Sequence, residues 1–436
     1  MHKAIVARIA KVEAIQGADR IQVAYVLGEA VIVQKTAQVG DIGVFFQPDL
    51  QLSEEFCHEN NLFRKSERNK DTTQKGFFEN NRRVRAQPFL KVKSEGFFCP
   101  LNHLVYTGTA ESEWSEGTSF DEVGGHKICQ KFISEKTKNA MAQATGKKKL
   151  KAVETPLFAR HVDTEQFKYY VGSIPKGAVL SFHDKLHGTS ARYSNTLVKK
   201  SYDSLTFWQK AMFHIRGGYP SQLESWEYVA GTRRVVLFEG QEQKEGFNGP
   251  EQWRFDWLEV LKPYLDKGLT VYGEIVGYAN GSPIMGTHNT APLKDKAFTK
   301  KYGETFTYSY GCHEGQNKFV VYRITQALND GTILEYTPSQ VIKWARDRGL
   351  EHTTRVHEDI VYDGHYENLI DLVEELTERT DVLCEDRTDP SHISEGIIIR
   401  VDGEKLQPKF YKNKSYAFKV CEGIYKETNV DVEDAS

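Results

Sequence analysis

The stretch FHDKLHGTSARY, residues 182–193, places a lysine, one spacer residue, a histidine and a glycine between two segments that favour strands. AVLSF before it and TSARY at its end are rich in residues that suit strands, and His187-Gly188 predicts a tight bend between them. Lys185 is therefore expected at the mouth of a strand-turn-strand unit. A lysine in this position is a surface charge, a phosphate clamp or a nucleophile, so the rest of the chain has to decide its role.

The length and composition exclude several classes of protein. The 436 residues are enough for two or three domains, and a net charge of -3 favours no partner by bulk electrostatics. The six cysteines include no CxxC pair, which argues against a disulfide framework or a zinc site and fits a reducing compartment. No apolar run approaches the roughly 20 residues that span a bilayer. We therefore expect a soluble, cytoplasmic protein without membrane contact; its oligomeric state is left open, with a monomer favoured.

The N-terminal part predicts a small barrel. Residues 1–105 contain short strand candidates at regular spacing, separated by glycine turns, which is typical of a closed or nearly closed β-structure. The first four candidates are AIVARIAKVEAI (4–15), IQVAYVLG (21–28), EAVIVQK (29–35) and IGVFFQPD (42–49). Residues 106–155 are expected to form a basic linker, since the segment 127–151 within them holds eight lysines and one acidic residue.

The remainder, residues 156–425, predicts a larger α+β unit followed by an acidic tail, 426–436. Proline at the start and glycine past the end mark two of its three expected helices. The helix candidates are PEQWRFDWLEVLKPYLDKG (250–268), TPSQVIKWARDRG (337–349) and ENLIDLVEELTER (367–379). The strand candidates are LTVYGEIVGY (269–278), KFVVYRIT (318–325), EGIIIRVDG (395–403) and SYAFKV (415–420). Residues 201–229 are long for a connector, and we expect either a helical insert over a nucleic-acid site or a packed subdomain.

Four features downstream of Lys185 each suit one part of a nucleotide. Glu274 in VYGEIVG can accept hydrogen bonds from ribose hydroxyls, and Tyr322 in VVYRI offers a ring face to a purine. Glu395 in SEGIIIR can hold Mg²⁺, and the lysines of KFYKNKSYAFK (409–419) can neutralise phosphate oxygens. Taken alone, Glu274 fits a structural role equally well, and the other three features fit structural roles better: a core ring for Tyr322, a turn or cap for Glu395 and a solvated face for the lysines. Their joint occurrence in this order favours a nucleotide site.

This ordered set resembles the motifs of the covalent nucleotidyltransferases, the superfamily of DNA ligases, RNA ligases and mRNA capping enzymes. The resemblance covers roughly 180–425, and KLHGTS, with histidine where DNA ligases and capping enzymes usually have aspartate, is similar to the RNA ligase branch. VGDIGVFFQPDLQL (39–52) and NNRRVRAQPFLKVKSEGFFCPL (80–101) are similar to the N-terminal OB module of the Deinococcus-type nick-sealing RNA ligases. The resemblance implies an α+β fold: an OB-like β-barrel, then a nucleotidyltransferase (ATP-grasp-like ligase) domain of antiparallel sheets with flanking helices.

The resemblance also implies an activity, two cofactors and a partner. Lys185 would attack the α-phosphate of ATP to form lysyl-AMP, with Mg²⁺ or Mn²⁺ present. The AMP would then pass to a 5′-phosphate, and the 3′-hydroxyl opposite would displace it, sealing RNA or an RNA-containing duplex at a nick. The resemblance implies a phosphate-binding lysine-x-lysine pair near the end of the domain, in the lysine-rich stretch 409–419, whose lysines we call the closing lysines. Lys412 and Lys414 fit this spacing, whereas Lys409 and Lys419 are alternative candidates.

The site residues that the resemblance implies fall into three further groups. The nucleotide-binding set is Asp184, His187, Gly188, Arg233, Arg234, Glu274, Tyr322, Lys409, Lys412, Lys414 and Lys419. Glu395 and Glu274 are the expected metal ligands. The segment RRVRAQPFLKVK interleaves basic and apolar residues, as a groove along a phosphate backbone would, although a charged edge strand has the same pattern. Its nucleic-acid-binding candidates are Arg82, Arg83, Arg85, Lys91 and Lys93.

Three alternatives stay open. A capping-type guanylyltransferase and a DNA ligase are disfavoured by the histidine after Lys185 and by the OB module at the N-terminal side. A catalytically inactive nucleic-acid-binding protein belongs to another class. Against that alternative, the candidate nucleophile, the metal carboxylate and a lysine pair are all present.

Overall fold

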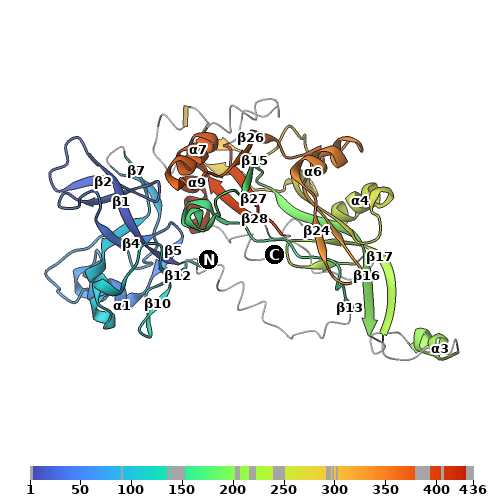
Figure 1. Cartoon of the computed structure of the whole chain (residues 1–436), viewed down its shortest axis with the longest axis horizontal. Helices are drawn as coiled ribbons and strands as arrows, with labels where there is room; N and C mark the ends of the chain where they lie inside the picture. Colours follow the sequence, from blue (N-terminus) through green and yellow to red (C-terminus); the bar gives the residue numbers. More distant parts are fainter. Residues whose placement is uncertain are drawn as a thin grey trace.

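The chain forms two β-rich units that lie side by side, with the N-terminal unit at one end of the molecule (Figure 1). In the part of the chain that the structure describes, no helix has both the length and the apolar character needed to cross a membrane. This computed structural model describes residues 3–89, 92–134, 138, 153–201, 207–215, 222–238, 251–290, 296, 299–300, 303–378, 393–403 and 407–428.

The N-terminal unit is built on a six-stranded sheet. Its order is β3-β2-β1-β4-β8, and β9 also pairs with β1. The pairs along this path are antiparallel, and alternate residues of the strands are buried in two core clusters. This architecture confirms the expected OB-like barrel. The strands are β1 (Ala4–Ala14), β2 (Ile21–Val26), β3 (Glu29–Gln34), β4 (Ile42–Phe46), β8 (Phe97–Pro100) and β9 (Ser119–Phe120).

The N-terminal unit extends beyond its expected end at residue 105. Strand β12 (Cys129–Lys131) pairs with β5 (Leu50–Leu52), and β9 pairs with β1. Phe120 and Ile128 are buried in the same core as β1 and β4. The linker predicted from residue 106 therefore starts too early, because two- and three-residue strands that pair far along the chain leave no periodic signal. Residues 135–137 and 139–152 of that linker lie outside the described residues.

In its described residues, the second unit is built on two large sheets, alongside one two-stranded pair. The larger has nine strands, with the path β18-β17-β16-β19-β23-β24. The smaller has five, in the order β14-β28-β27-β15-β26. Most pairs are antiparallel, as expected for an α+β fold. The strands on these paths are β14 (Glu165–Gln166), β15 (Val179–Lys185), β16 (Thr189–Ser201), β17 (Gln222–Gly231), β18 (Val236–Leu237), β19 (Leu269–Ala279), β23 (Asn317–Ala327), β24 (Ile333–Glu335), β26 (Arg355–Val361), β27 (Gly396–Asp402) and β28 (Lys409–Lys414).

Consecutive strands β15 and β16 belong to different sheets. The bend at residues 186–188 therefore joins the two sheets, and the strand that ends at Lys185 lies between β27 and β26 in the smaller sheet. The shorter elements are α1 (Glu54–Glu59), β6 (Ala86–Phe89), β7 (Val92–Glu95), β10 (Glu122–Val123), β11 (His126–Lys127), β13 (Val153–Glu154), β20 (Ser282–Pro283), β21 (His288–Asn289), β22 (Thr305–Phe306), β25 (Glu351–His352) and the 3₁₀ turns η1 (Ser66–Arg68), η2 (Leu101–Thr107), η3 (Glu111–Glu113), η4 (Phe167–Tyr169), η5 (Val171–Ser173) and η7 (Lys262–Tyr264).

Three helices lie where the sequence predicts them: α4 (Gln252–Leu261), α6 (Pro338–Arg346) and α7 (Tyr366–Glu378). Thr337 caps α6: its Oγ1 accepts from the Gln340 amide, and the Gln340 side chain accepts from the Thr337 amide. The predicted helix at 250–268 is shorter than expected, because Pro263 falls where the α-helix passes into the 3₁₀ turn η7.

Helix α9 (Tyr416–Thr428) replaces an expected strand and the first residues of the expected tail. The segment SYAFKV is rich in residues that favour strands, which predicts a strand at 415–420. Ser415 instead caps a helix, since its Oγ accepts from the Phe418 amide at 3.2 Å. Phe418 and Cys421 are then buried one helical turn apart.

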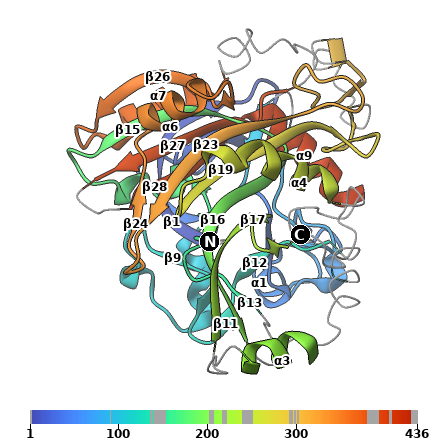
Figure 2. The same ribbon diagram turned by 90° about the vertical axis from the view of Figure 1, so that its right-hand side faces the viewer.

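In its described parts the long connector forms a helix at the end of a hairpin and no packed subdomain, and its expected position over a nucleic-acid site stays a prediction. Strands β16 and β17 make a long antiparallel hairpin, and α3 (Phe207–Ile215) lies at its outer end in both views (Figures 1 and 2). Residues 202–206 and 216–221 lie outside the described residues.

Candidate active site

The bend after Lys185 is fixed by close contacts on both sides. Lys185 pairs with Gly396 on β27, and the His187 amide donates to the Tyr310 hydroxyl at 2.7 Å. A Cβ atom on Gly188 would lie 2.5 Å from the carbonyl oxygen of Ile275, so only glycine fits there. The glycine of the motif therefore brings β16 close to β19, which is a positional role and not contact with the cavity.

Glu395 lies at the centre of a cluster of cations. Its Oε1 is 2.7 Å from the Nζ atom of Lys185 and 3.8 Å from that of Lys414, and its Oε2 is 3.5 Å from Nδ1 of His187. Burial disfavours the charge of Glu395, whose side chain is 1% exposed, but the charges of Lys185, His187 and Lys414 outweigh burial and lower its pKa to about 2. Glu395 is therefore an ionised carboxylate inside the protein.

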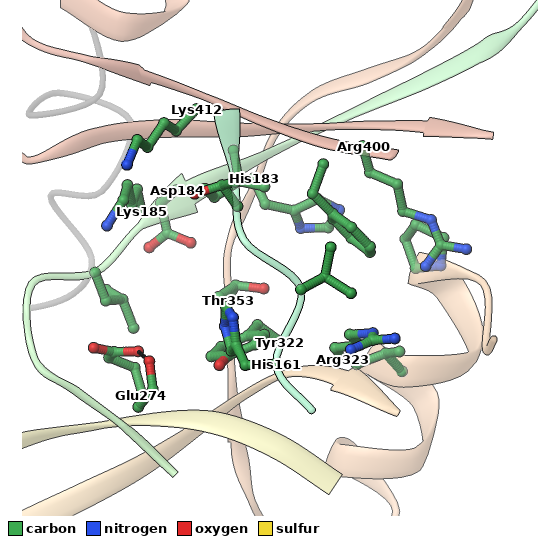
Figure 3. A pocket seen from close by; sticks show the side chains of 18 of the residues that line it. His161, His183, Asp184, Lys185, Glu274, Tyr322, Arg323, Thr353, Arg400 and Lys412 are labelled. Atoms are coloured by element: carbon green, nitrogen blue, oxygen red, sulfur yellow. Dashed lines mark hydrogen bonds between the residues drawn. The ribbon is translucent and has the colours of Figure 1, made fainter. Parts of the chain in front are cut away.

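A cavity opens beside Lys185 between the two sheets (Figure 3). Lys185, Asp184 and Lys412 lie at one end of it, whereas the guanidinium groups of Arg323 and Arg400 lie at the other. Seven of the residues predicted for the site line this cavity: Asp184, Lys185, Arg233, Glu274, Tyr322, Glu395 and Lys412. The two-sheet arrangement thus brings together residues that are far apart in the sequence.

Tyr322 enters the cavity because of a β-bulge. Along β19 and β23, Tyr272 pairs with Arg323 and Gly273 pairs with Val321, which leaves Tyr322 as the extra residue. A bulge redirects the side chain that it carries. Burial, and to a smaller extent the charge of Glu274, raise the pKa of the Tyr322 phenol, so it stays neutral. Its ring is available as a flat apolar surface.

Two carboxylates are held at defined positions on the cavity wall. Glu274 accepts a hydrogen bond from the Ser190 hydroxyl at 3.2 Å, across the β16–β19 pair. Asp184 is buried, and its Oδ1 accepts from the Thr354 amide at 2.6 Å. Each side chain is thereby fixed by a neighbouring strand or loop.

Arg233 and Arg234 are adjacent in sequence but differ in position. Arg233 lines the cavity, and its Nη2 lies 2.7 Å from Oδ1 of Asp163. Arg234 is exposed and is not among the cavity-lining residues. Of the two alternatives predicted for phosphate contact, the structure brings only Arg233 to the site.

Side chains alternate between the two faces of β28, so the closing lysines on this strand point in different directions. Phe410, Lys412 and Lys414 share one face of the strand; the first two line the cavity, and Lys414 reaches Glu395. Lys409 lies on the other face and is exposed, so its predicted nucleotide contact is not supported. Lys419 lies on α9 and pairs with Glu29 and Glu95 of the N-terminal unit, so its predicted place in the nucleotide site is wrong.

His187 lies next to the site but outside the cavity. Its ring meets the rings of Tyr308 and Phe418 at 4.6 and 4.9 Å between centroids, and it does not line the cavity. The predicted contact of His187 with the nucleotide is thus replaced by contact with Glu395.

Several cavity residues were missed by the sequence analysis. His161 lies against the Tyr322 ring at 5.8 Å, and burial together with Arg233 and Arg323 lowers its pKa to about 3, so it is neutral. No motif marks it, because it comes from an irregular segment before β15. Of the others, six lie on strands or helices already predicted and have no further signal: Arg323, Pro338, Val341, Ile342, Ile398 and Arg400. The rest of the lining consists of Val162, Thr164, His183, Leu186, Ser190, Thr353 and Phe410.

The carboxylates suit a magnesium site that is completed by a substrate. Within the described ranges, no three His, Cys, Asp or Glu side chains gather as a metal site. Mg²⁺ usually takes only one or two carboxylates together with phosphate oxygens and water. Glu395 and Glu274 both line the cavity, and among the described residues neither oxygen of Glu395 accepts a hydrogen bond of regular geometry. These residues therefore fit such an ion.

The three arginines predicted to bind nucleic acid also differ in their surroundings. Arg83 is buried, its Nη2 lies 2.7 Å from Oδ1 of Asp49, and its guanidinium stacks on Phe132, so its expected contact with nucleic acid is corrected to a structural one. Arg82 and Arg85 line a second cavity whose other polar residues include Gln51, Asn80, Asn81 and Gln130. Lys91 and the side chain of Lys93 lie outside the described residues.

Comparisons with known proteins match both units. A family described as RNA ligase matches residues 180–421, more than half of the chain, and an OB-fold domain matches residues 3–101. No curated protein sequence matches the chain.

Solved structures of the RNA ligase of Naegleria gruberi have the same fold at low identity, which shows the fold alone. A mutant with ATP and Mn is 16% identical with a TM-score of 0.54, covering 96% of this chain and 98% of that one. A mutant with AMP and Mn is 16% identical with a TM-score of 0.53, covering 95% and 97%. The ligase with PPi is 16% identical with a TM-score of 0.52, covering 96% and 98%.

Proposed function

The chain belongs to the RNA ligase family, and from this membership we propose that it joins RNA ends with ATP through a lysyl-AMP intermediate at Lys185. The observation that carries the proposal is the position of Lys185. Its amine lies at one end of a cavity that also holds a neutral aromatic ring, Tyr322, and two carboxylates, Glu274 and Glu395. The solved Naegleria ligase structures that contain ATP or AMP with Mn are consistent with these ligands.

In the first step the uncharged amine of Lys185 attacks the α-phosphorus of ATP. A P–N bond forms, the bond to the bridging oxygen breaks, pyrophosphate leaves, and the amine loses its proton. Tyr322 would stack on the adenine, Asp184 would contact its edge, and Glu274 would accept from the ribose hydroxyls. The protein's contribution is position and charge, since phosphoryl transfer needs little other chemistry.

The cations and the carboxylates of the cavity have different proposed roles around the phosphates. Lys412, Lys414 and Arg233 would neutralise phosphate oxygens. Glu395 and Glu274 would hold Mg²⁺ or Mn²⁺ together with the phosphates. Such an ion, when bound, supplies positive charge that stabilises the transferring phosphoryl group.

Two further transfers complete the ligation. A 5′-phosphate oxygen attacks the lysyl-bound phosphorus, so that the P–N bond breaks, the amine regains a proton, and an adenylylated 5′ end forms. The 3′-hydroxyl then attacks the 5′-phosphorus, AMP leaves, and a phosphodiester remains. We propose a nick in an RNA-containing duplex as the substrate, because the OB-fold module offers a second polar surface for the strand.

Arg82 and Arg85 are the proposed RNA contacts in that module. They line a cavity with four amide side chains, and amides and guanidinium groups are the usual partners of base edges and phosphates. Arg83 takes no part, since it is buried in an ion pair.

Covalent labelling tests the proposal. The protein is incubated with Mg²⁺ and α-labelled ATP or GTP, denatured, and assayed for label held by an acid-labile, base-stable bond. We expect labelling by ATP, its loss in Lys185→Ala, and its retention in Lys343→Ala, which removes an exposed lysine of α6. Labelling by GTP alone would indicate a capping-type enzyme. No labelling of folded protein would indicate a binding protein without activity, and labelling of Lys185→Ala would refute the assignment of the nucleophile.

A further inference from the structure

A cluster of buried charges joins the OB-fold module to the catalytic unit. Glu29 on β3 and Glu95 on β7 come from the module, and Lys168 on η4, Glu374 on α7 and Lys419 on α9 come from the catalytic unit. The cluster is outside the nucleotide cavity. Charged side chains are rarely buried in this number without a specific role.

The contacts within the cluster are continuous. The Nζ atom of Lys168 lies 3.3 Å from Oε2 of Glu29 and 2.8 Å from Oε1 of Glu374. The Nζ atom of Lys419 lies 3.3 Å from Oε1 of Glu29 and also pairs with Glu95. The side chains of Lys168 and Glu29 are only 2% and 5% exposed. Two carboxylates of the module are thus bridged by two lysines of the catalytic unit.

The contacts around the cluster are close. Leu27 and Gly28, at the tip of the β2–β3 hairpin, both have positive φ, and Lys168 donates to the Gly28 carbonyl at 3.1 Å. A Cβ atom on Gly28 would lie 2.6 Å from a methyl group of Ile370. The ring of Tyr169 packs against that of Phe45, with 5.7 Å between centroids. The hairpin tip and Phe45 of the module are therefore packed closely against the catalytic unit.

The charges of the cluster balance when one carboxyl is protonated. Three carboxylates face two ammonium groups. Burial and the charge of Glu95 raise the pKa of Glu29 to about 8 against the effect of Lys168 and Lys419, whereas Lys419 and Glu29 lower that of Glu95 against burial. Tyr169 beside them is buried, and its pKa is raised well above 10, so it stays neutral. With Glu29 protonated the cluster has no net charge, which removes the main objection to its burial.

Helix α9 contacts both the OB-fold module and the active site. Lys419 follows directly after Phe418, whose ring lies against the ring of His187. One turn later, Glu422 binds Lys414 at 2.8 Å. Because β28 ends at Lys414 and α9 begins at Tyr416, a shift of α9 moves both of these contacts.

We propose that Glu29 and Glu95 are positioning residues for the nucleotide site, acting through Lys419 and helix α9. This inference rests on the proposed function. The module then has a second role besides RNA contact: its docking holds the His187 ring and the Lys414 ammonium against Glu395. Docking through Lys168 contributes to the same interface but does not pass through α9; its link to β28 is through Glu374, whose Oε1 also accepts from the Asn413 side chain at 2.8 Å.

Lys168 therefore provides a matched control. Lys419→Met and Lys168→Met each remove one ammonium group from the same cluster, and thermal unfolding is expected to show a comparable loss of stability. We expect Lys419→Met to lower the rate of enzyme-adenylate formation at saturating ATP at least about tenfold, because small displacements of reacting groups have large effects on rate. The KM for ATP should change less than this rate, since Lys414, the proposed phosphate contact that moves, does not line the cavity. Lys168→Met should stay within about twofold of wild type, and Lys419→Arg, which keeps the charge, should recover most of the rate.

A second measurement does not depend on activity. The ring protons of His187 lie against the Phe418 ring, so their NMR chemical shifts in histidine-labelled protein report the position of α9. They should move in Lys419→Met and Glu95→Gln but not in Lys168→Met. Equal slowing and equal shifts in the two methionine variants would overturn the inference, as would a wild-type rate in Lys419→Met. Absence of any adenylate in wild-type protein would refute the proposed function instead, while the chemical shifts would still test the inference.

Discussion

The Nζ atom of Lys185 lies 2.7 Å from Oε1 of Glu395, and the opposite oxygen of that carboxylate lies 3.5 Å from Nδ1 of His187. The carboxylate therefore holds the amine of Lys185 in place from one side and contacts His187 on the other. For the proposed attack on phosphorus, the amine has to leave this ion pair and lose its proton. A divalent cation and the phosphates of ATP are groups that would compete for Glu395.

Replacement of Glu395 should affect both activity and stability. In Glu395→Gln the charge of Lys185 loses its buried partner, whereas Lys414 keeps Glu422, and breaking such a pair lowers the free energy of unfolding by about 3–5 kcal/mol. We expect a lower melting temperature and weaker adenylylation across a Mg²⁺ titration. Glu358→Gln, which removes an exposed carboxylate of β26, is the control. Unchanged adenylylation at every Mg²⁺ concentration would remove the role assigned to Glu395.

The bulge residue Tyr322 should determine the affinity for ATP. Removing a ring that stacks on a base loses about 1–3 kcal/mol, so Tyr322→Ala should raise the KM for ATP roughly 5- to 150-fold. Tyr322→Phe keeps the ring and should stay near wild type. Tyr193→Ala controls for lost packing, because Tyr193 is fully buried on β16 and does not line the cavity. An equal rise of KM in Tyr193→Ala would show that the effect is general loosening of the fold.

Alkaline pH should weaken the docking of the OB-fold module. The pKa of Glu29 is about 8 in the folded protein and 4.5 without the fold, so between these values the folded protein binds a proton that the unfolded chain has released. Stability therefore falls as the pH rises through this window, by up to about 1.4 kcal/mol per pH unit for one proton, and the loss is complete above the folded pKa. Denaturant unfolding from pH 6 to 9 measures it. Glu29→Gln should flatten the dependence, and an unaltered slope in that variant would contradict the assignment.

The active-site half of the fold could be predicted because its information is local. The bend at Gly188, the cap at Thr337 and the aliphatic strands around Glu274 and Tyr322 each leave a pattern within a few residues. The direction in which Tyr322 points depends on a bulge, and a bulge is a property of two paired strands. The sequence of β23 alone does not contain it.

Lys419 was misplaced for a different reason. It belongs to a lysine-rich stretch that fits a phosphate site, but its partners Glu29 and Glu95 lie more than three hundred residues earlier in the chain. Pairing across two units has no local pattern. For the same reason the sequence analysis missed the short strands β9 and β12, whose partners are β1 and β5.

Arg82 and Arg83 are neighbours in sequence, yet they should respond differently to substitution. Arg82 has a φ of 53°, its Nε donates to the Leu52 carbonyl at 3.0 Å, and it lines the polar cavity of the module. Each phosphate contact adds about one unit to the slope of log affinity against log salt. Arg82→Gln should therefore weaken binding to a nicked RNA duplex and lower that slope by about one unit, as measured by fluorescence anisotropy over a salt series.

Arg83→Gln should instead destabilise the module. It removes the buried guanidinium that pairs with Asp49 and stacks on Phe132, and breaking a buried pair of this kind loses about 3–5 kcal/mol. Well below its melting temperature the variant should keep the salt slope of the wild type, because Arg83 has no path to a phosphate from inside the core. A reduced slope in Arg83→Gln at full stability, together with an unchanged slope in Arg82→Gln, would place the RNA on a different face of the barrel.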